Sequence, residues 1–468
     1  MADFDLVVLG AGPGGYVAAI RASQLGLKTA VVESKYWGGV CLNVGCIPSK
    51  ALLRNAELAH IITHEKDTFG IEGDARMSFQ PTHARSRQVS DKIVKGVHFL
   101  MKKNKIAEIH GWGTLTGPKS MDVAMNDGSR QSLTFDNLII ATGATTRLIP
   151  GTSLSDRVVT YEEQILTDQL PGSIVIAGSG AIGVEFAYVM KNFGVDVTIV
   201  EFLDRMVPTE DAEVSKELLR HYKKLGVTVL LSTKVESIDD SGEKVRVTVS
   251  PAAGGESRVI ETDKVLQAIG FAPRLDGYGL EATGVATERG AITVDEHLRT
   301  SAEGVYAIGD ATGISMLAHT ASHQGEVAVS NALGEKRISA DYTAIPACVY
   351  TDPEIAYVGL SEAQARARGE DVRVGQFPFS ALGRAMVLGE TDGVVRVVTD
   401  GDGYLLGVTI MGPRATDLIA EAALALNVGI TAAELSHVVH AHPTLPEAIA
   451  EAALDVDGRA VHIAPRRR

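Results

Sequence analysis

The sequence predicts an α/β fold made of two similar α/β domains, followed by a C-terminal α+β domain. Three observations lead to this prediction. A strand, a glycine-rich turn and a helix occur in that order twice, and each copy continues into a second strand that ends in a glutamate. From about Ile345 the pattern changes to strands separated by glycines, and then to a helix rich in alanine and leucine. A chain of 468 residues also exceeds one ordinary core, so several domains are expected.

The first copy of the repeat lies at the N-terminus. An apolar strand over Leu6–Leu9 runs into the first glycine loop, residues 10–15, and a helix of small residues follows. The next strand, Thr29–Val32, ends at Glu33. Short apolar runs that alternate with glycine turns and helices are typical of a parallel sheet.

The second copy repeats this order. A strand over Ile174–Ala177 precedes the second glycine loop, residues 178–183, and the strand Val197–Val200 ends at Glu201. In both copies the glutamate stands 23 positions after the first glycine of its loop. One such loop could be only a tight turn, but two loops in the same context with the same spacing indicate dinucleotide-binding domains of the Rossmann type.

Each position in these loops has an expected role. The first glycine permits the turn, the second lets a pyrophosphate approach the backbone at a helix N-terminus, and the last allows the helix to pack closely. The glutamate accepts hydrogen bonds from ribose hydroxyls and repels a 2′-phosphate, so the second site should prefer NAD over NADP. The residues expected to bind a dinucleotide are Gly10, Gly12, Gly14, Gly15 and Glu33, and Gly178, Gly180, Ala181, Ile182, Gly183 and Glu201.

Charge and hydropathy exclude several partners. The formal net charge of −14 argues against nucleic acid or an anionic membrane as the main partner. The sequence has no apolar run long enough to span a bilayer, and the apolar N-terminal strand lacks the basic start of a signal peptide. We therefore expect the chain to work in the cytoplasm.

Cysteine usage indicates redox chemistry. The three cysteines are Cys41, Cys46 and Cys348, too few for the disulfide framework of a secreted protein. A structural zinc site usually has four ligands, and no second cysteine pair is present, so we expect no metal. Cys41 and Cys46 could be two buried thiols, but their spacing favours a small redox disulfide. Cys348 is expected to pack in a core.

A helix should begin beside the second cysteine. Pro48 stands at a plausible first helical position, which places Cys46 near a helix N-terminus, where the helix dipole favours a thiolate. Lys50 follows Cys46 by one turn on the same face, and its ammonium could favour the thiolate further.

Three segments carry a resemblance to a known family. Residues 38–50 read Gly-Gly-Val-Cys-Leu-Asn-Val-Gly-Cys-Ile-Pro-Ser-Lys, and they are joined by the segments 351–359 and 440–447. Together they resemble the dihydrolipoamide dehydrogenase branch of the pyridine nucleotide–disulfide oxidoreductase family, over essentially the whole chain. The triplet Pro48-Ser49-Lys50 favours this branch over glutathione reductases.

The resemblance implies FAD on the first glycine loop, NAD on the second and a dimer interface in the C-terminal domain. It implies an FAD-binding domain over 1–150, an NAD-binding domain over 151–275, a segment over 276–345 that completes the FAD domain, and an interface domain over 346–468. The further residues it places at the cofactors are Lys50, Gly113, Thr142, Gly143, Gly270, Asp310, Met316, Leu317, Ala318 and His319.

The resemblance also implies the catalytic roles. Cys41 exchanges with the substrate and Cys46 faces the flavin, while Lys50 lies near the reactive nitrogen of the flavin with Glu185 as its acidic partner. His442 is the acid/base, held by Glu447, because a carboxylate fixes the imidazole tautomer and favours proton uptake. From the residues alone, the cluster of His437, His440 and His442 could equally be a metal site or an ordinary polar surface.

The implied reaction is oxidation of protein-bound dihydrolipoyl groups with reduction of NAD. The implied assembly is a homodimer in which His442 serves the active site of the other subunit. Its partners would be the lipoyl domains of a 2-oxo-acid dehydrogenase complex, as the E3 component, or of a glycine-cleavage complex. Two departures from the family pattern are Pro446, which could change how Glu447 is aimed, and Arg274, which should have little effect.

Other functions stay open at this point. Another NAD(P)H-dependent flavin disulfide reductase or metal-ion reductase shares the same core. A mercuric reductase usually carries a further C-terminal cysteine pair, which we do not expect here, and a transhydrogenase would lack the second active-site cysteine. A purely structural subunit of a dehydrogenase complex is a further alternative, which Cys41, Cys46, His442 and Glu447 argue against.

Overall fold

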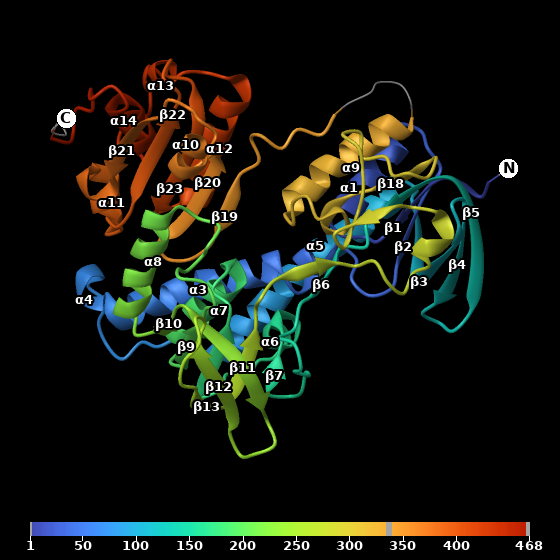
Figure 1. Ribbon diagram of the computed structural model, residues 1–468, viewed down its shortest axis with the longest axis horizontal. Helices are drawn as coiled ribbons and strands as arrows, with labels where there is room; N and C mark the ends of the chain where they lie inside the picture. Colours follow the sequence, from blue (N-terminus) through green and yellow to red (C-terminus); the bar gives the residue numbers. More distant parts are fainter. Residues whose placement is uncertain (1, 334–338, 465–468) are drawn as a thin grey trace. The chain divides into compact units, whose positions relative to one another are not determined.

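The computed structural model describes residues 2–333 and 339–464, and it has the expected α/β architecture (Figure 1). Contacts divide the chain into two compact units, residues 1–52, 78–170 and 267–340 in the first and 53–77, 171–266 and 341–468 in the second. The four segments expected from the sequence remain a prediction, and those over 1–150, 276–345 and 346–468 include residues outside the described ranges.

The first unit is built on a mainly parallel sheet. Strand β1 pairs in parallel with β2 and β5, and β18 pairs in parallel with β5. Strand β3 is long enough to pair in parallel with β2 by its first half and antiparallel with β4 by its second half. The strands of this sheet are β1 (Phe4–Leu9), β2 (Thr29–Glu33), β3 (Ala107–Gly117), β4 (Ser120–Met125), β5 (Arg130–Ile140) and β18 (Val305–Ala307).

Two helices of this unit pack closely through glycines. A side chain on Gly14 of α1 (Pro13–Gln24) would lie 2.8 Å from the carbonyl oxygen of Ala321 on α9 (Ala318–Ala332). A side chain on Gly325 of α9 would lie 2.8 Å from the carbonyl oxygen of Gly14. The two backbones can approach this closely only because both positions lack a Cβ.

The second glycine loop belongs to the second unit. Strands β8 (Ser173–Ala177), β9 (Asp196–Val200) and β10 (Thr228–Leu230) are parallel neighbours. The helices of this part are α7 (Ala181–Asn192) and α8 (Ala212–Lys224). The expected strands of both repeats lie within one residue of their observed ends, except that β1 begins two residues earlier than expected.

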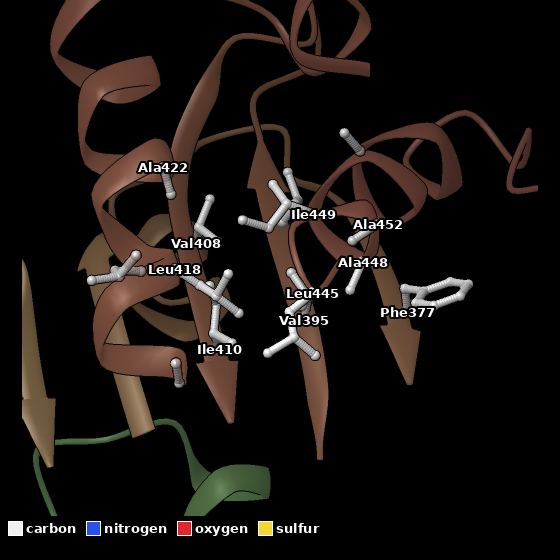
Figure 2. Packing of buried hydrophobic residues seen from close by; sticks show 14 of the residues in the cluster. Phe377, Val395, Val408, Ile410, Leu418, Ala422, Leu445, Ala448, Ile449 and Ala452 are labelled. Atoms are coloured by element: carbon white, nitrogen blue, oxygen red, sulfur yellow. The ribbon is translucent and has the colours of Figure 1, made fainter. Parts of the chain in front are cut away.

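The C-terminal part of the second unit is an antiparallel sheet covered by helices. Helix α12 (Ala415–Val428) packs along β20 and β23, and α14 (Glu447–Asp455) packs along β21 and β22. Figure 2 shows Ile449 and Ala452 of α14 among the apolar side chains of this sheet, where both are fully buried. The strands, in sheet order, are β19 (Ala347–Val349), β20 (Glu354–Gly359), β23 (Leu405–Gly412), β22 (Val394–Thr399) and β21 (Arg373–Pro378).

The remaining elements include two long helices, several short helices and strands, and a three-stranded antiparallel sheet. Within the described ranges, none of the helices combines the length and the apolar character needed to cross a bilayer. The remaining helices are α2 (Gly39–Asn43), α3 (Cys46–His64), α4 (Lys66–Phe69), α5 (Phe79–Lys103), α6 (Tyr161–Leu166), α10 (Glu362–Ala367), α11 (Gly383–Leu388) and α13 (Ala432–Ser436). The remaining strands are β6 (Ala144–Thr146), β7 (Val158–Val159), β11 (Thr233–Asp239), β12 (Val245–Pro251), β13 (Arg258–Thr262), β14 (Lys264–Gln267), β15 (Phe271–Pro273), β16 (Thr287–Glu288) and β17 (Ala291–Ile292).

Candidate active site

The two neighbouring cysteines form a disulfide. Cys41 lies in the short helix α2 and Cys46 is the first residue of α3, with their Cα atoms 4.5 Å apart. A tight turn at Gly45 joins the two helices, since a Cβ there would lie 3.0 Å from the carbonyl oxygen of Val40. The thiol–disulfide interpretation of this pair is confirmed, whereas the separate roles of the two sulfurs remain predictions.

The helix after the disulfide begins earlier than the sequence suggested. We expected Pro48 at its first position, but α3 starts at Cys46 and Pro48 is its third residue. A proline fits there because the first four N–H groups of a helix have no partner inside the helix. The consequence favours the proposed chemistry, because Cys46 lies directly at the positive end of the helix dipole.

The chain's own packing accounts for two glycines in each loop. Gly10 and Gly178 have φ angles of 106° and 103°, which other residues rarely adopt. A Cβ on Gly15 would overlap the carbonyl oxygen of Gly10, and one on Gly183 would overlap that of Gly178. The two loops therefore have the same geometry, in which the helix lies directly against the turn.

The middle glycine of each loop has no such explanation. Gly12 and Gly180 both have a φ of −66°, which any residue can adopt. An added Cβ on Gly180 would meet no atom within 4 Å, and one on Gly12 only the Cα of Gly39 at 3.9 Å. Open backbone in front of a helix N-terminus is what a pyrophosphate needs, so both loops fit a dinucleotide.

The glutamate after each loop has a structural role that the sequence did not reveal. The Glu33 carboxylate accepts hydrogen bonds from the backbone N–H groups of Ala11, at 3.0 Å, and Lys35, at 2.8 Å. Glu201 likewise accepts from the N–H groups of Ser179, at 2.7 Å, and Leu203, at 2.8 Å. Each carboxylate thus ties its glycine loop to the end of the following strand, and its contact with a ribose remains a prediction.

Asp310, expected near the flavin, lies in a half-buried position. It follows β18, and burial raises its pKa from the ordinary value of 3.8 to about 6. The segment 316–319 forms the start of α9, with Leu317 as its N-cap and Met316 exposed. A helix N-terminus beside an acidic group provides both backbone donors and an acceptor for a cofactor.

For the other residues expected at the cofactors, the structure shows a packing role at one position and local hydrogen bonds or open space at the rest. Gly113 is required by packing, since a Cβ there would lie 2.6 Å from the sulfur of Met121. Thr142 donates through its hydroxyl to the carbonyl of Arg274 at 3.2 Å, and Arg274 returns its N–H to the carbonyl of Gly143 at 2.9 Å. Gly270 has a φ of 111° and open space around it. Their contacts with a cofactor remain predictions.

Glu185 is held by a backbone group that the sequence could not indicate. It is buried on α7, and its Oε1 accepts a hydrogen bond from the Tyr350 N–H at 3.1 Å. Lys50 lies in the first compact unit and Glu185 in the second, so their pairing remains a prediction.

His442 and Glu447 form the expected pair. The Nδ1 of His442 lies 2.8 Å from Oε1 of Glu447, while Oε2 of Glu447 accepts from the N–H of Thr444 at 2.7 Å. Pro446 directly precedes α14 and does not prevent these contacts. Partial burial acts to raise the pKa of Glu447, but the Thr444 and His442 hydrogen bonds outweigh it and the pKa is lowered.

The imidazole of His442 is available to a substrate, because its side chain is 79% exposed. The neighbouring His440 has its own partner, since its Nε2 lies 2.7 Å from Oε1 of Glu421 on α12. These two histidines therefore pair with different glutamates. Cys348 is half-buried against the core of the C-terminal sheet, as expected.

Two family models match the chain. Residues 4–325 match the pyridine nucleotide-disulphide oxidoreductase model, and residues 345–453 match the dimerisation domain of the same family, which supports a homodimer.

Curated relatives match almost the full length. The chain is 56% identical to a dihydrolipoyl dehydrogenase of Mycobacterium tuberculosis, over 96% of this chain and 97% of that protein. The dihydrolipoyl dehydrogenase of Corynebacterium glutamicum is 49% identical, over 98% and 99% of the two chains.

Solved structures agree with the fold. The crystal structure of LpdA from Mycobacterium tuberculosis superposes with a TM-score of 0.88 at 30% identity, covering 96% of this chain and 98% of that one. The HOCl-induced flavoprotein disulfide reductase RclA from Escherichia coli gives a TM-score of 0.86 at 27% identity, over 96% and 99% of the two chains. The chain therefore belongs to the pyridine nucleotide-disulphide oxidoreductase family, among its FAD- and NAD-using dihydrolipoyl dehydrogenases.

Proposed function

We propose that the chain oxidises protein-bound dihydrolipoyl groups to lipoyl groups and reduces NAD. The observation that carries this proposal is the Cys41–Cys46 disulfide at the start of α3, in a chain so similar to dihydrolipoyl dehydrogenases. A disulfide at a helix N-terminus is a good acceptor for a dithiol, because the leaving sulfur departs as a stabilised thiolate.

The exchange at the disulfide requires two steps. A substrate thiolate attacks the sulfur of Cys41, a mixed disulfide forms, and the Cys46 sulfur leaves as a thiolate at the positive end of α3. The second substrate thiol then attacks the substrate sulfur of the mixed disulfide and releases Cys41 as a thiolate. The substrate has lost two electrons and two protons, and the cysteine pair holds the electrons.

His442 manages the protons in this scheme. Its Nδ1 faces Glu447, which leaves Nε2 to take a proton from the substrate thiol, and the attacking species is then the thiolate. Glu447 is ionised and fixed on α14, so it can stabilise the imidazolium that forms. We place His442 of one subunit at the disulfide of the other.

The glycine loops would hold the two cofactors, FAD on residues 10–15 and NAD on residues 178–183. Bound FAD supplies the two-electron chemistry between the dithiol and NAD, the terminal hydride acceptor. Lys50 and Glu185 would contact the flavin. Glu201 would repel a 2′-phosphate, which favours NAD over NADP.

We infer that the partners are the lipoyl domains of a 2-oxo-acid dehydrogenase complex, where the chain would act as the E3 component, or of a glycine-cleavage complex. The support is the name shared by the curated relatives. We place the enzyme in the cytoplasm, because a chain with only three cysteines, two of them in a redox-active disulfide, suits a reducing compartment.

Steady-state assays of the purified holoprotein test this function. The protein should be yellow and reduce NAD with dihydrolipoamide as the donor. Cys41→Ser should lower that turnover by at least about 10³-fold, because it removes the attacked sulfur. Cys348→Ser is the matched control and should change it little. Colourless protein, or turnover with another dithiol but not with dihydrolipoamide, would contradict the proposal.

A further inference from the structure

Three potential metal ligands converge away from the site described above. Glu217 and His221 lie one turn apart on α8, and Asp392 comes from the connection between α11 and β22. The Nε2 of His221 lies 3.3 Å from Oε1 of Glu217 and 3.6 Å from Oδ2 of Asp392. Among the described residues, these three form the one group whose ligand atoms all lie within 4.8 Å of each other.

A single cationic nitrogen already lies among these ligands. The Nη2 atom of Arg220 is 2.5 Å from Oε1 of Glu217, 3.5 Å from Nε2 of His221 and 3.6 Å from Oδ1 of Asp392. The Arg220 side chain is 57% exposed, so it can turn into solvent without breaking a core. The three ligands therefore surround a position that a cation occupies and can vacate.

The spacing around His221 suits a metal better than an ion pair. Nε2 of His221 lies farther from both carboxylates than the roughly 2.8 Å of a charge-assisted hydrogen bond. By contrast, ligands about 2.0–2.1 Å from a tetrahedral zinc ion stand about 3.4 Å apart, close to the two separations measured from Nε2 of His221.

We propose that Glu217, His221 and Asp392 bind a divalent transition-metal ion, Zn²⁺ in particular, after Arg220 swings out. One imidazole and two carboxylates are a familiar zinc donor set, and water completes the tetrahedron. A bound ion would tie α8 to the segment before β22.

Zinc binding to the oxidised holoenzyme tests the proposal, because the Cys41–Cys46 disulfide then offers no thiolate to the ion. Competition with a chromogenic chelator should give one Zn²⁺ per chain at this site, and Co²⁺ should give the absorption of a tetrahedral complex. His221→Gln and Asp392→Asn should each weaken the site by at least about tenfold and abolish the cobalt absorption. Arg220→Ala should tighten it, because the competing cation is gone.

His297→Gln is the matched control. His297 is buried to a similar degree as His221 and lies 3.5 Å from Oε1 of Glu296, without forming a three-ligand group among the described residues. This variant should bind zinc like the wild type. Unchanged zinc binding in both His221→Gln and Asp392→Asn would overturn the proposal, and so would an Arg220→Ala variant that binds no more tightly. Melting temperatures of the zinc-free variants would show that each still folds.

Discussion

At the scale of single residues, the candidate site depends on side chains fixed by rigid neighbours. Glu447 is the first residue of α14, whose next residues Ala448 and Ile449 are fully buried, so the carboxylate is presented from a well-packed element. Cys46 is fixed in the same way as the first residue of α3. Glu447 and Cys46 are therefore both preorganised by helix ends.

Another residue, Glu210, makes the stability of the protein depend on pH. It is buried between β9 and α8, and its Oε2 has no hydrogen-bond partner among the described residues. Burial raises its pKa from 4.5 to about 8, with Asp211 adding to the rise and the Thr209 hydroxyl opposing it. The folded state thus binds a proton that the unfolded chain releases above about pH 4.5.

The sign of this effect gives a prediction. The stabilisation is complete below pH 4.5 and is lost as the pH rises towards about 8, by up to about 1.4 kcal/mol per pH unit. Glu210→Gln imitates the protonated form, so its urea midpoint should fall less than that of the wild type between about pH 5 and pH 8. The exposed Glu213→Gln should behave like the wild type. Parallel pH profiles for Glu210→Gln and the wild type would contradict this account.

The contacts at this scale were only partly predictable. His442 and Glu447 lie five positions apart, and the family pattern marks both. The partner of Glu185 is a backbone N–H 165 positions away, and every residue except proline carries such a group, so no sequence signal exists. The pairing of His440 with Glu421 across 19 positions was missed because one glutamate among many on a helix is not distinctive.

At the scale of elements, different glycines of the two loops serve folding and binding. Gly183 is required by the fold, because a Cβ there would overlap the carbonyl oxygen of Gly178, whereas the space beside Gly180 is open. This division was predictable, since the spacing of the glycines and the following glutamate is local in sequence. The exact start of α3 was not, because a proline is tolerated at several positions of a first helical turn.

A pair of substitutions tests this division. Gly180→Ala should leave the melting temperature close to the wild-type value and raise the dissociation constant for NAD by at least about tenfold, because the methyl group fills the pyrophosphate position. Gly183→Ala should destabilise the fold by about 1–3 kcal/mol or more, through steric overlap. Thermal unfolding and NAD titration of both variants provide the measurements. A Gly180→Ala protein that binds NAD normally would show that this position does not contact the nucleotide.

At the scale of the whole molecule, the proposed reaction needs residues from both compact units. The disulfide belongs to the first unit, and the pair of His442 and Glu447 belongs to the second. The match to a dimerisation domain over residues 345–453 supports a homodimer. The sequence could predict both halves of the site separately, but the pairing of subunits comes only from the family resemblance.

Mixed dimers test the shared site. Chains carrying Cys41→Ser and chains carrying His442→Gln should each be nearly inactive alone. If His442 serves the partner's disulfide, each heterodimer has one intact site, so random assortment should restore about a quarter of the wild-type turnover. Mixing Cys41→Ser with Cys46→Ser should restore none, because no arrangement then provides an intact disulfide. Equal failure of both mixtures would place His442 and the cysteines of one site in the same chain.

The hydrogen bonds that the loop N–H groups donate to Glu33 and Glu201 have a consequence for turnover. Because each loop is already fastened to its strand, a nucleotide does not have to order the backbone on arrival, and little conformational entropy is lost at that moment. Both loops are fixed in the same way. This part of the molecule therefore does not distinguish the FAD that stays bound from the NAD that leaves in every cycle. The difference in their residence times must then arise from the contacts made by the rest of each dinucleotide.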